Sequence, residues 1–523
     1  MVVFPGESGF LSCNPNKTQK NYFSVDFSRD LNCIIGGRGT GKSTLLNIIE
    51  TVLTLESDDI KKLEFISRHE RIYILFYYKN CDYLIEFVPQ KKDLDREYYT
   101  DNIFLEGAFS KSLSSKYKLS SHWIQLYKVE DNNYNKIPEK QSYEILSDVY
   151  KRTYSINSII NQVNKGKIGE FIREVILNGM NNDEIMSYLK KLNTIRKSSF
   201  RKYLRENIQE MIKAVETRRK QIEEHLDEYN KEYKDFIEII YSPRKKNIDY
   251  YLKDLLDEIS NDENILNTRL TWNDVARYIQ TVSKKIGYMN FLDLLFNKRF
   301  KELQEHLNIS DMVQKRAENY SDIENEYDIL DSKKAENILQ KIHIVLSDNY
   351  RPFLIDSIYK WFKVVDDFTL KFNINSKEQT YQSKPVMKEI TEMSLGQKVV
   401  AILTFIFNYG YYVNDNTPLI IDQPEDNLDN QYIYKNLVES LKQIKNNRQV
   451  IIVTHNSTIV TNSDTEQVIV MDSNHSNGWV ENKGYPTDKR ITKLIIIFLE
   501  GGIESFKHKM QTYTLFINEL NEN

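Results

Sequence analysis

The sequence predicts an α/β protein whose parallel sheet is divided between the two ends of the chain, with a long helical segment inserted between them. A glycine-rich loop at 36–43 separates an apolar strand from a helix. Apolar strands alternate with helices again between Leu419 and Met471, which is typical of a parallel sheet. Between these regions glycine almost disappears and apolar residues recur every three or four positions.

The N-terminal part is expected to contain one strand before the loop, one helix after it, a β-hairpin, a further strand pair and a second helix. These elements are expected at Leu31–Ile35, Lys42–Leu55, Arg71–Tyr78 with Asp82–Val88, Ser121–Val129 and Gly166–Leu177.

The middle of the chain is expected to be helical. The helical spacing runs from Asn182 through Tyr241, breaks at Ser242 and Pro243, and resumes from Lys246 to about Ser347. An unbroken first helix would reach roughly 90 Å. Two such tracts form either an antiparallel arm or a compact helical domain, and the pattern leaves both open. The expected division of the chain is 1–180, 181–350 and 351–523.

The C-terminal part is expected to return to alternating strands and helices. The strands are expected at Asp367–Ile374, Leu419–Ile421, Val450–Thr454 and Gln467–Met471, and the helices at Gly396–Phe407 and Gln431–Ile444.

The composition excludes several classes of protein. With 71 Lys and Arg against 75 Asp and Glu, the chain is no polycation, so contact with DNA or RNA must come from local patches. Its three cysteines, far apart in the sequence, indicate neither a disulfide framework nor a zinc site. Apolar runs such as Val399–Phe407 are too short to cross a membrane. A cytoplasmic protein is expected.

The glycine-rich loop matches the phosphate-binding pattern G-x-x-x-x-G-K-[ST] at every fixed position. Its residues, with the following threonine, are Gly36, Gly37, Arg38, Gly39, Thr40, Gly41, Lys42, Ser43 and Thr44. Backbone N–H groups of such a loop and the helix N-terminus bind phosphates. Lys42 is expected to reach the β- and γ-phosphates of ATP, and the Ser43 hydroxyl to ligate Mg²⁺.

A second motif supplies an acid. Pro418 and three apolar residues lead into Asp422, the pattern of a strand that ends in a carboxylate for the Mg²⁺ site. The two motifs together resemble the ATP-binding-cassette fold, in its RecF- and SMC-like branch for DNA repair and chromosome maintenance.

This resemblance implies further site residues. The run Met393–Lys398 is similar to the family's signature loop, in which Ser394, Gly396 and Gln397 would meet ATP bound by a second protomer. Asp429, after Asn427 and Leu428, resembles the loop that crosses the dimer interface. His455 is similar to the switch histidine. The resemblance thus implies a head-to-tail homodimer, or a higher oligomer, that uses ATP and Mg²⁺.

The family also has a glutamine that senses Mg²⁺ and the γ-phosphate. Gln162, just before an expected helix, is the candidate, and Gln90 and Gln125 are alternatives.

One departure concerns catalysis. The family usually has Glu after the strand-end Asp, but this chain has Gln423. An amide cannot accept a proton as a carboxylate does, so hydrolysis is expected to be slow. Either Glu425 or Asp426 replaces the carboxylate, or His455 positions the water, or the protein mainly senses ATP.

The run Ile421–Asn430, with Leu499–Phe506 and Tyr513 near the C-terminus, resembles ATPases of bacterial antiphage systems, notably PtuA of Septu and its retron-associated versions. The resemblance implies a separate HNH nuclease (PtuB) as partner and, in retrons, a reverse transcriptase with its RNA–DNA product. No Asp-x-Asp follows His455, so a nuclease of the Toprim type is not expected in this chain. Glu504 and His508 are read as a solvated helix face.

A basic stripe is the candidate for nucleic-acid binding. Helical spacing aligns Lys190, Lys197, Arg201 and Arg205, and such a stripe can follow a phosphate backbone. The alternative is a solvated face or a contact with an acidic protein. For the whole chain, the alternatives to an antiphage ATPase are a stand-alone repair ATPase and a slowly hydrolysing scaffold.

Overall fold

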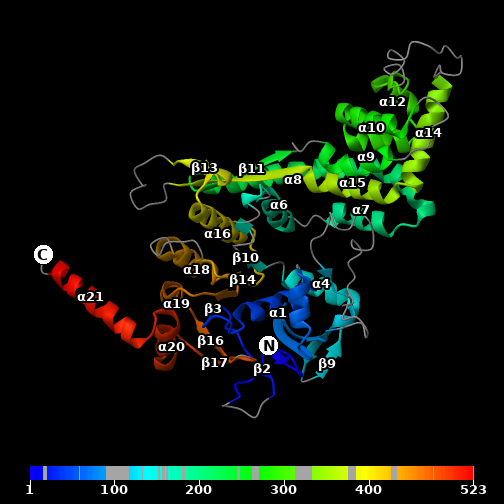
Figure 1. Ribbon diagram of the computed structural model, residues 1–523. Coiled ribbons are helices and arrows are strands. Elements are labelled where there is room, and N and C mark those ends of the chain that lie inside the picture. Colours follow the sequence, from blue (N-terminus) through cyan, green and yellow to red (C-terminus); the bar gives the residue numbers. More distant parts are fainter. Residues whose placement is uncertain are drawn as a thin grey trace.

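The computed structural model places two sheets at one end of the molecule and the inserted helices at the other (Figure 1). It describes residues 1–15, 21–57, 59–89, 117–119, 121–131, 133–150, 153–155, 159–160, 163–166, 168–179, 183–243, 248–261, 270–312, 332–374, 385–425, 433–474 and 476–521.

The central sheet has the strand order β10-β14-β15-β3-β16-β17. Its strands are β10 (Thr153–Ser155), β14 (Leu419–Asp422), β15 (Val450–Val453), β3 (Leu31–Gly36), β16 (Gln467–Ser473) and β17 (Gly478–Gly484). All neighbours are parallel except β16 and β17. Since β3 lies between strands from the C-terminal part, the prediction of a split parallel sheet is confirmed.

The second sheet is antiparallel, in the order β2-β1-β5-β6-β8-β9. Its strands are β2 (Phe23–Ser24), β1 (Val2–Phe4), β5 (Arg71–Tyr78), β6 (Cys81–Phe87), β8 (Ile124–Glu130) and β9 (Asn133–Lys136). The expected hairpin is confirmed as β5–β6. Its turn residues Lys79 and Asn80 both have positive φ, as a tight hairpin turn requires.

Helices α1 (Lys42–Thr54), α2 (Ile60–Ile66), α4 (Glu139–Val149) and α6 (Ile168–Gly179) belong to the N-terminal part, and short strands β4 (Glu56–Ser57) and β7 (Tyr117–Lys118) pair beside them. In the C-terminal part lie α16 (Leu395–Tyr412), α18 (Val438–Ile444), α19 (Ser457–Asn462), α20 (Lys489–Leu499) and α21 (Ile503–Asn521). α18 follows a π-helical turn at Ile433–Leu437. The helices expected near 166–177, 396–407 and 431–444 are thereby confirmed.

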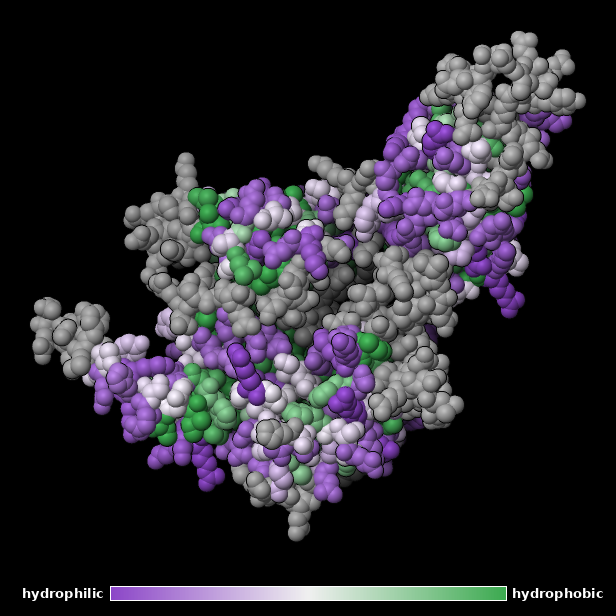
Figure 2. Space-filling model, viewed as in Figure 1, coloured by the Kyte–Doolittle hydropathy of each residue, from purple (hydrophilic) through white to green (hydrophobic). Residues whose placement is uncertain are grey.

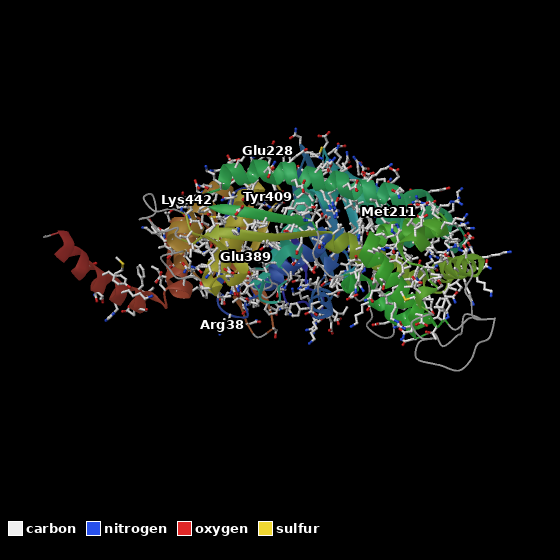
Figure 3. All side chains as sticks on the ribbon, turned by 90° about the horizontal axis from the view of Figure 1, so that it is seen from above. Arg38, Met211, Glu228, Glu389, Tyr409 and Lys442 are labelled. Carbon is white, nitrogen blue, oxygen red and sulfur yellow. The ribbon has the colours of Figure 1, made fainter. Side chains whose placement is uncertain are left out.

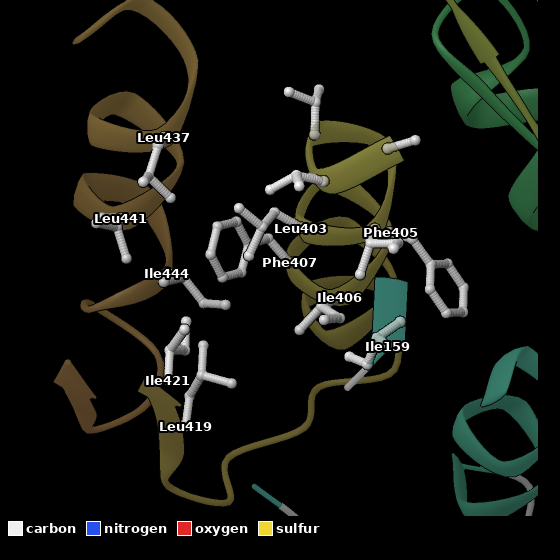
Figure 4. Close-up of a cluster of buried hydrophobic side chains, with 14 of the residues drawn as sticks. Ile159, Leu403, Phe405, Ile406, Phe407, Leu419, Ile421, Leu437, Leu441 and Ile444 are labelled. Atoms are coloured by element: carbon white, nitrogen blue, oxygen red, sulfur yellow. The ribbon is translucent and has the colours of Figure 1, made fainter. Parts of the chain in front are cut away.

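Buried side chains of α16 fill the space between α18 and β14. Figure 4 shows Leu403 and Phe407 on the side of α16 that faces Leu437, Leu441 and Ile444 of α18, and Ile444 above Ile421 of β14. Almost every side chain of α16 from Val399 to Phe407 is buried, which explains why this run is apolar all round.

The inserted helices are α7 (Asp183–Thr194), α8 (Lys197–Tyr233), α9 (Asp249–Ser260), α10 (Trp272–Ile286), α11 (Tyr288–Phe296), α12 (Phe300–His306), α14 (Ser332–Asp348) and α15 (Arg351–Val364). They share one apolar cluster, and their visible outer surface is mostly hydrophilic (Figure 2). The second helical tract therefore forms a compact helical domain, which is one of the two arrangements that the sequence left open. This domain packs on the single long helix α8. At 37 residues, α8 spans about 55 Å.

The helical prediction for the end of the first tract is wrong. Residues Ile237–Pro243 form strand β11, which pairs antiparallel with β12 (Asp366–Asn373), and β12 in turn pairs with β13 (Met387–Glu389). Ile237 and Ile239 are buried at alternate positions, the period of a strand. Asn230 of α8 bonds both the N–H and the C=O of Ile239, at 2.9 and 2.8 Å.

Two contacts fix α8 to the head. Arg218 pairs with Asp366 of β12, and both side chains are almost fully buried. Tyr241 of β11 donates to the same carboxylate at 2.7 Å. Nearer its C-terminal end, α8 places His225 and Tyr229 against Tyr409 of α16. Figure 3 shows Tyr409 beside the Glu228 end of α8, whereas Met211 lies toward the inserted helices.

His343 of α14 should make stability depend on pH. It is buried against the ring of Phe296, 4.9 Å away between centroids, and burial lowers its pKa to about 4. Because the unfolded side chain titrates near 6.5, unfolding takes up a proton between these pH values, so stability falls as the pH falls. We expect the free energy of unfolding to drop by about 2 kcal/mol more between pH 7 and 5 in the native chain than in His343→Leu. Denaturant unfolding at both pH values measures this difference, and equal drops would contradict it.

Candidate nucleotide site

The glycine-rich loop connects β3 to α1 at the C-terminal edge of the central sheet. Gly36 has φ +145°, and a Cβ there would lie 2.2 Å from the carbonyl oxygen of Met471. Gly41 has φ +89°, and its Cβ would lie 2.7 Å from the ring of Phe10. Both positions therefore require glycine, which keeps the backbone of the loop accessible to a phosphate.

Lys42 lies inside this loop. Its ammonium donates to the carbonyl oxygens of Gly36 and Gly37, at 2.8 and 2.6 Å, and Thr40 Oγ1 donates to Gly37 at 2.9 Å. Burial lowers the pKa of Lys42, and the charge of Asp422 opposes that shift. No side chain caps the start of α1, and Ser43 beside it is exposed. These features fit a bound phosphate with Mg²⁺.

The strand register brings the second motif to the same edge. Asp422, the last residue of β14, is opposite Val453 of β15, and Val453 is opposite Ile34 of β3. The strands thus end together, and Asp422 lies close enough to Lys42 to influence its pKa. The sequence predicted both residues from separate motifs, and the structure brings them together.

The residues after Asp422 turn sharply. Gln423 has φ +49°, a rare conformation for a non-glycine residue, and its N–H donates to the carbonyl oxygen of Val453 at 2.9 Å. This turn directs Glu425 toward the end of β15. There one carboxylate oxygen of Glu425 accepts from Thr454 Oγ1 at 2.8 Å and from the backbone N–H of His455. The carboxylate is therefore fixed beside the backbone of His455, the expected switch histidine, whose side chain is exposed.

The residues that the sequence predicts as a signature loop begin α16. Ser394 is its N-cap, and it forms a capping box with Gln397: Ser394 N–H donates to Gln397 Oε1 at 3.1 Å, and Ser394 Oγ accepts from Gln397 N–H at 3.4 Å. Ser394 is exposed, and Gly396 follows in the first turn. The helix N-terminus is thus preformed and open to an outside ligand.

Several expected site residues lie outside the described part of the chain, namely Gln162, Asp426 and Asp429, as does the alternative Gln90. The other alternative, Gln125, lies in β8, and its amide donates to the carbonyls of Leu126 and Ile137. The Gln125 side chain therefore forms hydrogen bonds within the antiparallel sheet.

Sequence reasoning missed the residues that support the loop from the N-terminal segment. His69 Nε2 accepts from the N–H of Leu11 at 3.1 Å, and Phe10 beside it packs against Gly41. Gly478 of β17 completes this contact, because its N–H donates to the Phe10 carbonyl at 2.8 Å. No local sequence pattern predicts contacts between segments that are so distant in the chain. Among the described residues, no group of three or more His, Cys, Asp or Glu could hold a metal ion.

The basic stripe is partly neutralised. Arg201 pairs with Asp348 of α14, and Lys202 and Arg205 lie 4.0 and 3.9 Å from Glu206. These pairs favour the solvated-face interpretation for Arg201. The side chain of Lys190 lies outside the described part.

The chain is similar in sequence to known proteins. Residues 9–238 match the model of the AAA_23 family, described as an AAA domain. The chain is 24% identical over 389 residues to the structural maintenance of chromosomes protein 3 homolog of Plasmodium falciparum. That match covers 71% of this chain and 28% of the relative's length.

Similar solved structures are SMC head domains. One is the Pyrococcus furiosus Smc head with an extended coiled coil, bound to the C-terminal domain of ScpA (14% identity, 94% of this chain, 97% of that chain, TM-score 0.34). Another is the SMC head domain of Thermotoga maritima (10% identity, 90% of this chain, 95% of that chain, TM-score 0.32). These TM-scores are too low to transfer residue positions.

The phosphate loop and the acid-bearing neighbouring strand lie in the fold of an ATP-binding-cassette head with an inserted helical arm, and the AAA_23 match covers the phosphate loop within residues 9–238. Within the described residues, no helix is both long and apolar enough to span a membrane.

Proposed function

We propose that the chain hydrolyses ATP at sites shared between two protomers. The observation that carries this proposal is the convergence of Lys42, Asp422 and Glu425 at one sheet edge, combined with an exposed, capped N-terminus at Ser394. Residues 36–44 hold the phosphates, and Ser43, Asp422 and Gln162 hold Mg²⁺. Ser394, Gly396, Gln397 and Asp429 meet the nucleotide of the other protomer. His455, fixed by Glu425, faces the attacking water.

The proposed biological role is that of a PtuA-like ATPase subunit in a cytoplasmic antiphage complex of bacteria. The support is the resemblance carried by Ile421–Asn430. In this role the ATP state controls a partner HNH nuclease, with a reverse transcriptase and its RNA–DNA product joining in retron systems. The second candidate, a stand-alone RecF- or SMC-like repair ATPase, is favoured by the likeness to a chromosome-maintenance protein. Purification from the native operon, followed by mass measurement, separates them, because only the first retains a nuclease.

A mixing experiment tests the shared site. Lys42→Ala removes the phosphate ligand, and Ser394→Arg places a large side chain at the start of α16, so each variant alone should be inactive. A head-to-tail pair of one Lys42→Ala and one Ser394→Arg protomer keeps one intact site. Because half of randomly mixed dimers are of this kind, activity should recover to about a quarter of the native rate.

Two controls accompany this measurement. The first control uses Thr281→Arg in place of Ser394→Arg. Thr281 is an exposed residue of α10, so this variant should remain active on its own. Thermal unfolding establishes that each variant is folded. Folded variants that show no recovery on mixing would overturn the shared site.

Gln423→Glu should raise the single-turnover rate of hydrolysis by about 10²-fold, because it restores a carboxylate that can accept a proton from water. The matched comparison is Glu425→Gln. This variant removes a negative charge two positions from Gln423, but it keeps a side-chain oxygen that can accept hydrogen bonds from Thr454 and His455. We expect Glu425→Gln to retain hydrolysis within about threefold if Glu425 only positions the loop. An unchanged rate in Gln423→Glu, with ATP binding intact, would show that slow hydrolysis has another cause and would favour the scaffold alternative.

A further inference from the structure

The run Leu499–Phe506, one of the sequence motifs described above, forms the junction between α20 and α21. Figure 1 shows this junction beside α19, with α21 projecting away from it. Two glycines make the turn. Gly501 and Gly502 have φ +81° and +95°, and the Gly502 N–H donates to the carbonyl of Ile496 at 3.1 Å. Residues with this left-handed conformation end a helix. The residue before them, Glu500, is therefore held at a defined place on the head.

The carboxylate of Glu500 joins two helices. One oxygen accepts from the hydroxyl of Ser457, the first residue of α19, and the other accepts from the ammonium of Lys509 in α21 at 3.2 Å. The Glu500 side chain is only 21% exposed, and Ser457 is half-buried. A charged acceptor forms a stronger hydrogen bond than a neutral one. Glu500 therefore restrains the start of α19.

Helix α19 begins two residues after His455. Asn456 caps it, because its side-chain oxygen accepts from the N–H of Thr458 at 2.8 Å. The Asn456 N–H in turn donates to Thr454 Oγ1 at 3.0 Å, and Thr454 Oγ1 donates to Glu425. A continuous set of hydrogen bonds therefore runs from the end of β15, through the segment that contains His455, to the start of α19.

Glu425 and Glu500 hold opposite ends of this segment. Glu425 accepts from Thr454 Oγ1 and from the backbone N–H of His455, whereas Glu500 accepts from Ser457. The backbone of His455 is thus restrained from both sides, while its imidazole is exposed. At six residues, α19 is too short to be stable by itself. Loss of either carboxylate would therefore let the segment move.

We infer that Glu500 is a positioning residue for ATP hydrolysis: through Ser457 and the start of α19, it keeps His455 where the imidazole faces the attacking water. The inference rests on the role proposed above for His455, and it gives the junction of α20 and α21 a part in the reaction. A misplacement of about 1 Å in a catalytic group can lower a rate by about 10²-fold. A residue that only holds such a group can therefore affect hydrolysis strongly and ATP binding little.

Single-turnover hydrolysis, with the chain in excess over ATP, tests this role. Glu500→Ala and Ser457→Ala should each lower the first-order rate constant about tenfold, while the dissociation constant for ATP changes less than about twofold. The rate constant describes only chains that bind ATP, so a loss of folded protein does not lower it. Glu500→Gln keeps an oxygen for the Ser457 hydroxyl and should stay within about threefold of the native rate constant.

Two comparisons separate positioning from a general loss of stability. Because Glu500 and Ser457 act through one hydrogen bond, the double variant Glu500→Ala with Ser457→Ala should be no slower than Glu500→Ala alone. Glu504→Ala is the matched control. This neighbouring acid is 86% exposed and pairs with Lys507 at 3.0 Å, so its loss should leave the rate constant unchanged.

The inference is overturned if Glu500→Ala keeps the native rate constant, or if the effects of the two single variants add. It is also overturned if Glu500→Gln is as slow as Glu500→Ala, because the acceptor for Ser457 is then not what matters. An equal loss of ATP affinity would assign Glu500 to the binding site instead. A native rate constant in His455→Ala would overturn the proposed role of His455. If His455→Ala is slow and Glu500→Ala is not, only the inference about Glu500 fails.

Discussion

Replacing Lys42 by alanine is expected to lower the rate of ATP hydrolysis by about 10²–10³-fold. The ammonium is buried within the loop and bonded to the carbonyls of Gly36 and Gly37, so its positive charge is already held inside the phosphate loop. Alanine removes the only positive charge that the phosphate loop directs inward among its described side chains, since Arg38 is exposed. Steady-state phosphate release at saturating ATP measures the effect.

Lys61→Ala, on the exposed start of α2, is the matched control for this prediction and should retain the native rate. The thermal midpoint of Lys42→Ala without nucleotide should stay close to that of the native chain, because Lys42 contributes to nucleotide binding and not to folding stability. A Lys42→Ala protein that hydrolyses ATP within threefold of the native rate would contradict the placement of the site.

Arg218→Ala is expected to have the largest effect on stability, about 3–5 kcal/mol in the free energy of unfolding. It leaves the carboxylate of Asp366 buried without its cation, with the Tyr241 hydroxyl as its remaining bond. The pair joins α8 to β12, so its loss loosens the connection between arm and head. Denaturant unfolding, followed by circular dichroism, measures the difference.

Lys213→Ala on the same helix gives the comparison for an exposed pair. Lys213 and Glu210 are 65% and 52% exposed, and such pairs contribute about 0–1 kcal/mol. The double variant Arg218→Leu with Asp366→Asn removes both charges and should be more stable than Arg218→Ala. If Arg218→Ala cost no more than Lys213→Ala, the buried pair would have no structural role.

The sequence predicted those parts of the fold that carry their own local pattern. The phosphate loop and the strand ending at Asp422 each have one, and both motifs predicted residues of one nucleotide and Mg²⁺ site. The hairpin β5–β6 was predicted because its strands alternate and its turn is short.

The remaining parts depend on partners distant in the sequence. Residues 237–243 continue a helical pattern, but pairing with β12 and the side chain of Asn230 select a strand, so tertiary contacts override the local preference. Strand β10 has only three residues, too few for a period to show. Likewise, the bonds of Glu425 to Thr454 and His455 follow from the register of β14 against β15, which no residue spacing reveals.

The aromatic contact between α16 and α8 has a mechanical consequence. The helix that starts at Ser394 ends at Tyr409 and Tyr412, against His225 and Tyr229. It therefore acts as a rod of about 27 Å with one end at the nucleotide edge and the other at the base of α8. A tilt of 10° at that base displaces the far end of a 55 Å helix by about 10 Å. A shift of about 1 Å at one end of α16 corresponds to a tilt of about 2°, which the longer α8 would convert into a displacement of about 2 Å at its far end.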